Sequence, residues 1–321
     1  MIKDSLNIKG RPAIILAPME GITDLPFRIL CIELGADLVY TEFISARNLV
    51  SQTKEALRKI RILKEHQSTT VIQLYGNSPE LLAEAAVIAE QRHPTYIDLN
   101  FGCSTRKVTG SNCGSAVIKD LNQSLAICTE VVNKTQLPIT VKTRLGYYDD
   151  QPNYIEHALM LQDTGIQAFC LHGRFKNQKY DVPADWKAIR KLKEHNDIRI
   201  PIIGNGDLNS AEITRQQHKE TSVDALMIGR ASLGNPWIFR QCIQAFNGEE
   251  VQQPTIEERK ATAKRHLELN LLYKDNEDIA LREIRKHYTN YFNTLPDFPK
   301  LKKQLMTSSN ASEVFQIIDS L

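Results

Sequence analysis

The sequence predicts an α/β protein, a (β/α)8 TIM barrel followed by a small all-helical C-terminal domain. Short β-branched runs alternate with segments of helical period between residues 13 and 245. Eight such βα units in about 230 residues fit a closed barrel better than an open doubly wound sheet, which is the structural alternative. Strand signals stop after residue 246, and helical periodicity takes over. We therefore expect a barrel over residues 1–246 and a helical domain over residues 247–321.

Each expected strand is a short apolar run of the kind buried in parallel sheets. In chain order the runs cover residues 13–17, 37–43, 69–75, 95–100, 138–144, 167–172, 200–204 and 223–228. The segment at 78–91 illustrates the intervening helices. Ser78 can cap it, Pro79 suits its first turn, and leucines and alanines form its apolar stripe.

Polar and glycine residues follow the expected strands, at the barrel end where active sites of this fold gather. In strand order these ends carry Pro18-Met19-Glu20-Gly21, Glu42-Phe43, Gln73, Asn100 with Cys103, Lys142 with Arg144, His172-Gly173-Arg174, Gly204-Asn205-Gly206-Asp207 and Gly229-Arg230. Packing alone does not account for one convergent polar group per strand. We therefore expect the site at this mouth.

The loop after residue 100 places a thiol, Cys103, beside the basic pair Arg106 and Lys107. A cysteine on a glycine-containing loop near positive charge is placed for chemistry. The alternative is a small buried cysteine, as most intracellular cysteines are. The unusual ends of the other strands favour the chemical interpretation.

The last two strand ends predict a phosphate-bearing ligand. Glycines at 204, 206 and 229 free backbone N–H groups, and Arg230 adds a charged fork. The Gly-x-Gly lacks the third glycine of a dinucleotide fingerprint and comes late in the chain.

Three more side chains at the mouth, Lys142, His172 and Gln73, suit an electron-rich ring system such as an isoalloxazine. Each has a structural alternative. His172 could cap its strand, Gln73 could pair with backbone, and Lys142 could form a salt bridge with Glu42.

The C-terminal segment begins with a polar linker at 247–254, and its clearest helix is expected at 279–293. Its apolar stripe comprises Leu281, Ile284, Tyr288, Tyr291 and Phe292, and a second stripe comprises Arg282, Arg285, Lys286 and Thr289. Residues 282–303 hold six Lys or Arg against two acids. This excess favours a surface for phosphate backbones over an ordinary solvated face.

Composition excludes several classes of protein. The 321 residues carry a net charge of only +2, and the six cysteines and eight histidines form neither CxxC nor HExxH, so neither a disulfide scaffold nor a metal site is expected. No apolar stretch approaches the roughly 20 residues of a membrane span. Residues 1–10 are polar and lack the apolar centre of a signal peptide. A cytoplasmic location without membrane contact is expected.

Together, these motifs resemble those of the tRNA-dihydrouridine synthases, flavoproteins that reduce particular uridines in tRNA. The resemblance covers residues 16–305. It rests on Leu16-Ala17-Pro18-Met19-Glu20-Gly21-Ile22-Thr23-Asp24, Asp98-Leu99-Asn100-Phe101-Gly102-Cys103, Val141-Lys142-Thr143-Arg144-Leu145-Gly146, His172-Gly173-Arg174, Gly204-Asn205-Gly206-Asp207, Met227-Ile228-Gly229-Arg230 and Arg285-Lys286-His287-Tyr288.

The resemblance implies an FMN cofactor, NADPH or NADH as reductant, tRNA as partner and a monomeric enzyme. It implies FMN contacts from Pro18, Met19, Glu20, Gln73, Lys142 and His172, and phosphate contacts from Asn205, Gly206, Asp207, Gly229 and Arg230. Cys103 would donate the proton to C5 as the flavin hydride reaches C6. Asn100 and Arg144 would orient the flipped uracil, and tRNA would contact Arg282, Arg285, Lys286 and His287. Such chemistry needs a hydride donor facing a general acid across an extruded base.

Two residues depart from the family pattern. Ser104 stands where the family usually has proline, which removes a fixed φ, and Cys113 stands where a small residue is usual. A small-molecule FMN reductase and an RNA-binding protein on a decayed barrel are the alternative functions. The basic tail disfavours the first, and retention of Cys103, Lys142, His172 and Arg230 disfavours the second. The tail and Gly234-Asn235-Pro236-Trp237 resemble the subgroup acting near tRNA position 17, and Thr109-Gly110-Ser111 is similar to the subgroup acting at position 16. We favour position 17.

Overall fold

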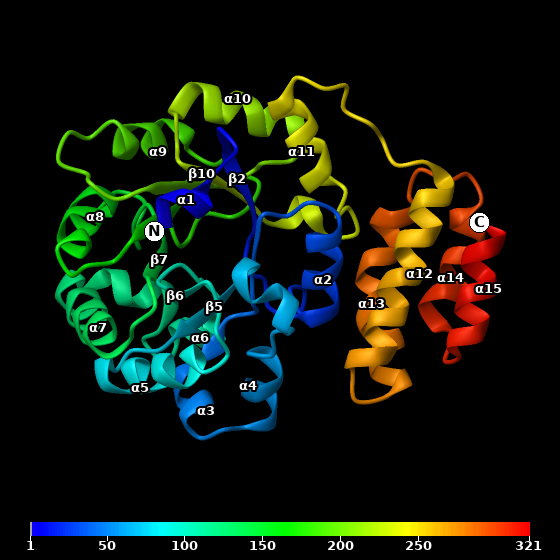
Figure 1. Ribbon diagram of the computed structural model, residues 1–321, viewed down its shortest axis with the longest axis horizontal. Coiled ribbons are helices and arrows are strands. Elements are labelled where there is room, and N and C mark those ends of the chain that lie inside the picture. The colour runs from blue at the N-terminus through cyan, green and yellow to red at the C-terminus, as the bar shows by residue number, and fades with distance from the viewer. Residues whose placement is uncertain (1) are drawn as a thin grey trace.

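A computed structural model describes residues 2–321 and contains a closed parallel β-barrel with a helical tail beside it (Figure 1). Its barrel strands are β2 (Arg11–Leu16), β3 (Leu38–Tyr40), β5 (Thr70–Tyr75), β6 (Tyr96–Asn100), β7 (Ile139–Arg144), β8 (Ala168–His172), β9 (Ile202–Asn205) and β10 (Ala225–Ile228). Strand β2 pairs in parallel with both β3 and β10, which closes the sheet. The predicted barrel is confirmed, and the doubly wound alternative is wrong because such a sheet has two open edges.

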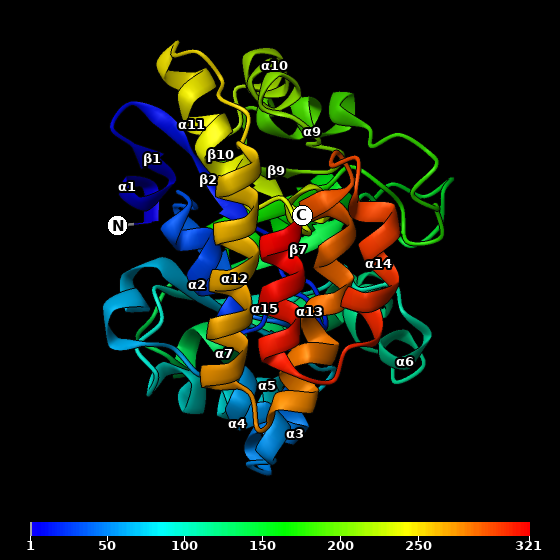
Figure 2. The same ribbon diagram turned by 90° about the vertical axis from the view of Figure 1, so that its right-hand side faces the viewer.

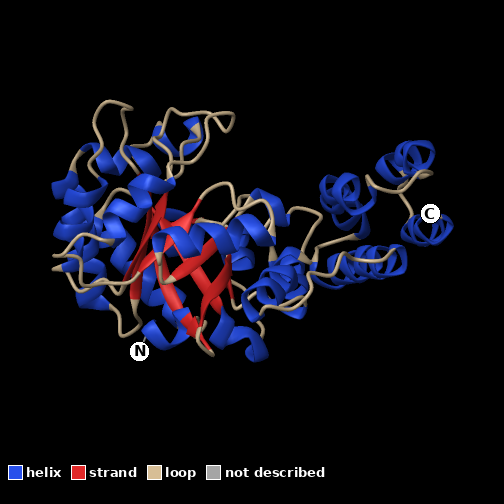
Figure 3. Ribbon diagram, turned by 90° about the horizontal axis from the view of Figure 1, so that it is seen from above, coloured by secondary structure: helices blue, strands red, loops and turns tan. Residues whose placement is uncertain are grey.

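Helices surround the barrel (Figure 3). They are α2 (Leu25–Glu33), α3 (Ala46–Val50), α4 (Lys54–Lys59), α5 (Pro79–Glu90), α6 (Arg106–Thr109), α7 (Leu121–Lys134), α8 (Tyr154–Gln162), α9 (Trp186–Lys193), α10 (Ala211–Thr221) and α11 (Ile238–Asn247). Helix α5 matches the predicted segment, and the Ser78 hydroxyl caps it by accepting from Leu81 N at 3.3 Å.

Three short elements were not predicted. The N-terminal helix α1 (Ile2–Leu6) leads into β1 (Asn7–Ile8), which forms an antiparallel hairpin with β2. Strand β4 (Ile44–Ser45) pairs with β5, and β3 ends at Tyr40 instead of residue 43. Ile2 and Leu6 pack with the apolar residues inside the barrel, so α1 adds to that interior core.

The alternation of side chains along the strands determines which residues reach the mouth. The interior core includes Ala13, Ile15, Tyr40, Val71, Cys170, Ile203 and Met227. Successive side chains in a strand point to opposite faces, so positions two residues further along share the inward face. Gln73, His172, Asn205 and Gly229 stand at such positions, and so the strands themselves direct the predicted site residues inward.

The tail holds α12 (Ile256–Tyr273), α13 (Glu277–Phe292), α14 (Phe298–Thr307) and α15 (Ala311–Ser320), which lie side by side in Figures 1 and 2. Helix α12 packs on α2 of the barrel. The predicted apolar stripe of the 279–293 helix is confirmed, since Leu281, Ile284, Tyr288, Tyr291 and Phe292 are all buried. Within residues 2–321, no helix is long and apolar enough to cross a membrane.

Buried histidines predict a steep loss of stability in acid. Burial lowers the pKa of His157 to about 3 and that of His266 to about 4, so both rings are neutral in the fold. Unfolded histidines titrate near 6.5, so the unfolded chain takes up protons as the pH falls below that value while the folded chain does not. Stability is therefore full above pH 6.5 and falls towards pH 4. His157 alone should lower the free energy of unfolding by about 2 kcal/mol at pH 5 relative to pH 7.

The change His157→Leu tests this expectation. Both ring nitrogens of His157 are buried without a hydrogen-bond partner, and the ring packs between Phe101 and Phe169. Denaturant unfolding at pH 5 and pH 7 should show a smaller difference for the variant than for the original chain. An equal difference would mean that His157 is protonated in the folded state.

Candidate active site

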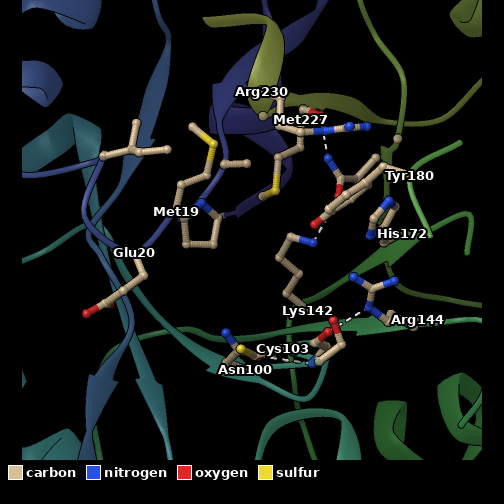
Figure 4. A pocket seen from close by; sticks show the side chains of 18 of the residues that line it. Met19, Glu20, Asn100, Cys103, Lys142, Arg144, His172, Tyr180, Met227 and Arg230 are labelled. Carbon is tan, nitrogen blue, oxygen red and sulfur yellow. Dashed lines mark hydrogen bonds between the residues drawn. The ribbon is translucent and has the colours of Figure 1, made fainter. Parts of the chain in front are cut away.

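A cavity of about 330 Å³ opens at the carboxyl ends of the barrel strands. It brings together every barrel residue predicted for the site except Gln73: Pro18, Met19, Glu20, Asn100, Cys103, Lys142, Arg144, His172, Asn205, Gly206, Asp207, Gly229 and Arg230. Figure 4 shows Met19 across the cavity from Lys142, Arg144 and His172. The mouth of the barrel is therefore a preformed cavity and the candidate ligand site.

Gln73 lies below this cavity and is fully buried. Its amide nitrogen donates to Asp98 Oδ2 at 2.7 Å, and its amide oxygen accepts from Asn100 Nδ2 at 2.8 Å. Burial raises the pKa of Asp98 to about 6, against the opposing hydrogen bonds of Thr140 and Gln73. Gln73 thus pairs with side chains instead of backbone, and the expectation that it lies at the cavity surface is not met. Its position instead fixes Asn100.

The loop that carries Cys103 is held by several hydrogen bonds. The Asn100 side-chain oxygen accepts from the backbone nitrogens of Gly102 at 3.0 Å and Cys103 at 2.8 Å. Arg144 Nε donates to Gly102 O at 2.7 Å, and Ser115 N donates to Cys103 O at 2.9 Å. This leaves the half-buried Cys103 thiol at the cavity wall, with Thr105 Oγ1 3.3 Å from Sγ.

A cation and a neutral imidazole also line the cavity, on the strands that follow β6. Lys142 Nζ donates to Asn205 Oδ1 at 2.9 Å, and Asn205 Nδ2 donates to Met227 O at 2.7 Å. The alternative pairing of Lys142 with Glu42 is wrong, because Glu42 accepts from Gly21 N at 2.7 Å and lies 4.0 Å from Lys59.

His172 is neutral, because burial and then the neighbouring Arg144 and Lys142 charges lower its pKa well below the usual range. Its Nε2 lies 3.3 Å from Arg174 Nη1. A guanidinium can only donate, so Nε2 accepts and the ring proton sits on Nδ1. His172 therefore has one N–H to offer a ligand acceptor.

The predicted phosphate end combines one carboxylate with two arginines. Asp207 Oδ2 accepts from Arg174 Nη2 at 2.5 Å, and Asp207 Oδ1 accepts from Arg230 Nη2 at 3.0 Å. A carboxylate repels a phosphate, so the side chain of Asp207 serves to position Arg230 instead of binding an anion itself. The Arg230 side chain is 51% exposed and keeps other N–H groups free for a ligand.

Sequence reasoning missed Tyr180, which lines the cavity from the loop after β8. The Arg230 guanidinium carbon lies 3.8 Å from the centre of its ring, and Tyr180 is 55% exposed. A loop tyrosine among polar residues gives no periodic signal. Only the exposed aromatic ring in the fold identifies it.

Comparisons with known proteins identify the family of this chain. The dihydrouridine synthase (Dus) family model matches residues 15–320. The chain is 36% identical to "Probable tRNA-dihydrouridine synthase" of Rickettsia conorii, over 91% of this chain and 87% of that protein. The chain belongs to the dihydrouridine synthase family. It is also 37% identical to "tRNA-dihydrouridine synthase B" of Vibrio parahaemolyticus, over 88% and 86% of the two chains.

Solved structures support the fold of this family member. Histamine dehydrogenase from Rhizobium sp. 4-9 has a TM-score of 0.57 at 12% identity over 83% of this chain, and 2-naphthoyl-CoA reductase has 0.55 at 10% over 77%. The chain covers 51% and 53% of those larger proteins. At such identities the likeness concerns the barrel fold alone.

The two departures from the family pattern leave the Cys103 loop ordered. Ser104 lines the cavity within a loop that hydrogen bonds of Asn100 and Arg144 hold. Cys113 is buried, and its Sγ donates to Ser111 O at 3.2 Å. Burial raises the pKa of Cys113, which keeps it a thiol.

The predicted tRNA contacts on α13 occupy different environments. Arg282 is exposed, whereas Arg285 Nη2 donates to Ser308 O at 3.0 Å within the tail. Lys286 Nζ donates to Gly21 O of the barrel. His287 is 1% exposed, so its ring does not reach the surface, and we correct its assignment as an RNA contact. Among residues 2–321, no cluster of three His, Cys, Asp or Glu side chains could hold a metal ion.

Proposed function

We propose that this protein is an FMN-dependent tRNA-dihydrouridine synthase that reduces a specific uridine of tRNA to 5,6-dihydrouridine, with NADPH as reductant. The observation that carries the proposal is the Cys103 thiol, held at the wall of a cavity that also presents Lys142, His172 and Arg230. The names of the relatives support tRNA as the substrate. Outside the barrel, residues 282–303 of the tail carry six Lys or Arg against two acids.

The cavity residues fit an FMN. Gly206, in the cavity lining, has a φ of +130°, and a Cβ there would lie 2.6 Å from the Cβ of Ala184, so only glycine fits this turn. A Cβ at Gly229 would meet nothing closer than 3.8 Å, so this stretch opens into the cavity. Arg230 supplies the charged fork beside both glycines. The cavity volume of about 330 Å³ is in the range of small-molecule sites.

The chain's own residues provide the remaining chemistry. A bound reduced flavin supplies a hydride for C6 of the uracil ring. Cys103 Sγ holds the proton that C5 receives, because a general acid must face the hydride donor across the base. Lys142 places positive charge at the cavity, and His172 Nδ1–H would donate to an acceptor atom of a bound flavin ring. Asn100 and Arg144 orient the Cys103 thiol by holding the loop that carries it.

Asn100→Ala should lower the rate of uridine reduction by about tenfold, because misplacement of a reacting group by a fraction of an ångström is costly. The effect is bounded because Arg144 and Ser115 still hold the loop. Asn122→Ala is the control, since Asn122 is exposed on α7 and its loss should leave the rate unchanged. Single-turnover rates measure the effect. Equal rates for both variants would remove the loop-holding role from Asn100.

The tRNA surface is proposed on three exposed basic residues of α13 and α14, Arg282, Lys302 and Lys303. The exposed Lys300 is left out because it pairs with Asp297 at 2.9 Å. Their simultaneous change to alanine should weaken tRNA binding and reduce the log-log salt slope by roughly 0.7 to 0.9 for each phosphate that the variant leaves unneutralised. A salt titration of tRNA binding measures both quantities, with flavin content as the control. Unchanged affinity and slope would place the RNA surface elsewhere.

A further inference from the structure

Helix α13 touches two neighbouring loops that line the cavity, one after each of the paired strands β2 and β10. These are the β2–α2 loop, residues 17–24, and the β10–α11 loop, residues 229–237. We propose that α13 clamps these two loops and thereby couples cofactor binding to tRNA binding. The inference rests on the proposed function and adds a positioning role for Lys286, His287 and Asn290, residues that no cofactor or substrate atom needs to touch.

The β2–α2 loop is fastened to the tail by two lysines. Lys286 Nζ, on α13, donates to Gly21 O, next to Met19 and Glu20 of the cavity wall. Lys274, just after α12, pairs with Asp24 at 2.5 Å and with Glu283 of α13. The Lys274 side chain is only 5% exposed, so this bridge lies inside the junction between tail and barrel.

Asp24 adds a second constraint on the same loop. Its carboxylate accepts from Phe27 N at 3.0 Å and so caps α2, the first helix after the loop. On the barrel side, Gly21 N donates to Glu42 Oε1 at 2.7 Å. The loop is therefore held between a barrel carboxylate and two tail lysines, and movement of α13 must displace Gly21.

The β10–α11 loop is hydrogen-bonded to the same helix, α13, through residues that follow Lys286. Gly234 N donates to His287 Nδ1 at 3.1 Å, and Asn290 Nδ2 donates to Leu233 O at 2.6 Å. Gly234 packs so closely that a Cβ there would lie 2.4 Å from His287 O. His287 is itself fixed against Phe27, with ring centres 4.7 Å apart. Arg230, proposed for the phosphate, stands four residues before Gly234.

The exposed Arg282 is on the same helix, one turn before Lys286. A phosphate bound to Arg282 restrains helix α13, which contacts both cofactor loops. Restraint of α13 by tRNA then stabilises the loops in their ligand-binding arrangement, and by linkage a bound cofactor favours tRNA by the same factor. The tail is thus part of the cofactor site as well as an RNA-binding surface.

The test compares FMN dissociation constants of the full chain, depleted of flavin, with and without saturating unmodified tRNA. For the original chain the constant should fall about fivefold or more when tRNA is present, a typical coupling between sites. Lys286→Met keeps the aliphatic stem but removes the bond to Gly21 O, and the ratio should then fall to within about twofold of unity. Asn290→Ala should act in the same direction through the other loop.

Lys219→Met is the matched control, since Lys219 is exposed on α10 away from both loops. It should keep the full ratio. A purely structural role for Lys286 would lower the melting temperature and leave the ratio unchanged, which would overturn the proposal. The proposal would also be overturned if the original chain bound FMN and tRNA but its FMN dissociation constant were the same with and without tRNA. Absence of both FMN and tRNA binding would instead overturn the proposed function.

Discussion

Cys103→Ala is expected to lose about 10²-fold to 10⁴-fold in the rate of uridine reduction, the usual contribution of a positioned general acid. FMN and tRNA should still bind. The Cys103 thiol hydrogen-bonds to Thr105 Oγ1, whereas the hydrogen bonds that hold the loop are made by the backbone of Cys103. Single-turnover reduction of tRNA by the photoreduced enzyme measures the chemical step directly.

Cys113→Ala is the matched control for this variant. Cys113 is 7% exposed and its thiol bonds to Ser111 O, away from the cavity lining. The control should retain nearly the full rate. If Cys103→Ala reacts as fast as the control, another group supplies the proton.

Arg230→Ala should weaken FMN binding by about 10-fold to 100-fold, as expected when one or two charge-assisted hydrogen bonds are removed. The variant should stay folded, since the Arg230 side chain is half exposed and Asp207 keeps its bond to Arg174. It should therefore purify largely colourless.

The control for Arg230 is Arg215→Ala, which removes an exposed arginine from α10. Flavin absorbance at equal protein concentration compares the two variants, and circular dichroism verifies their fold. Full flavin content in Arg230→Ala would contradict a phosphate site at the ends of β9 and β10.

The barrel could be predicted because each strand is a short apolar run with a polar end, a pattern that a closed parallel sheet imposes on its residues. The elements that were missed are too short for periodicity. Strand β1 has two residues, Asn7–Ile8, and its pairing with β2 is a tertiary event. The early end of β3 has the same cause, because a separate strand β4 takes over the pairing with β5.

The sequence predicts which residues lie near the candidate site, but not which side chains they hydrogen-bond to. Spacing could place Gln73 and Asn100 at strand ends, yet only the fold shows that they bond to each other. His287 was misassigned for a different reason. It lies three residues after Ile284 and four before Tyr291, so the helical period already put it on the buried stripe. The resemblance implied His287 as an RNA contact because it belongs to the shared motif Arg285-Lys286-His287-Tyr288.

The most direct test of the proposed function is dihydrouridine formation on unmodified tRNA by the purified yellow protein with NADPH. We predict dihydrouridine at a single tRNA position, near position 17, with none formed by Cys103→Ala. Mapping the product along the tRNA locates the position. Absence of flavin and of any reduction would leave only an RNA-binding barrel. Reduction of free pyrimidines with no product in tRNA would contradict the proposed function and identify a small-molecule reductase.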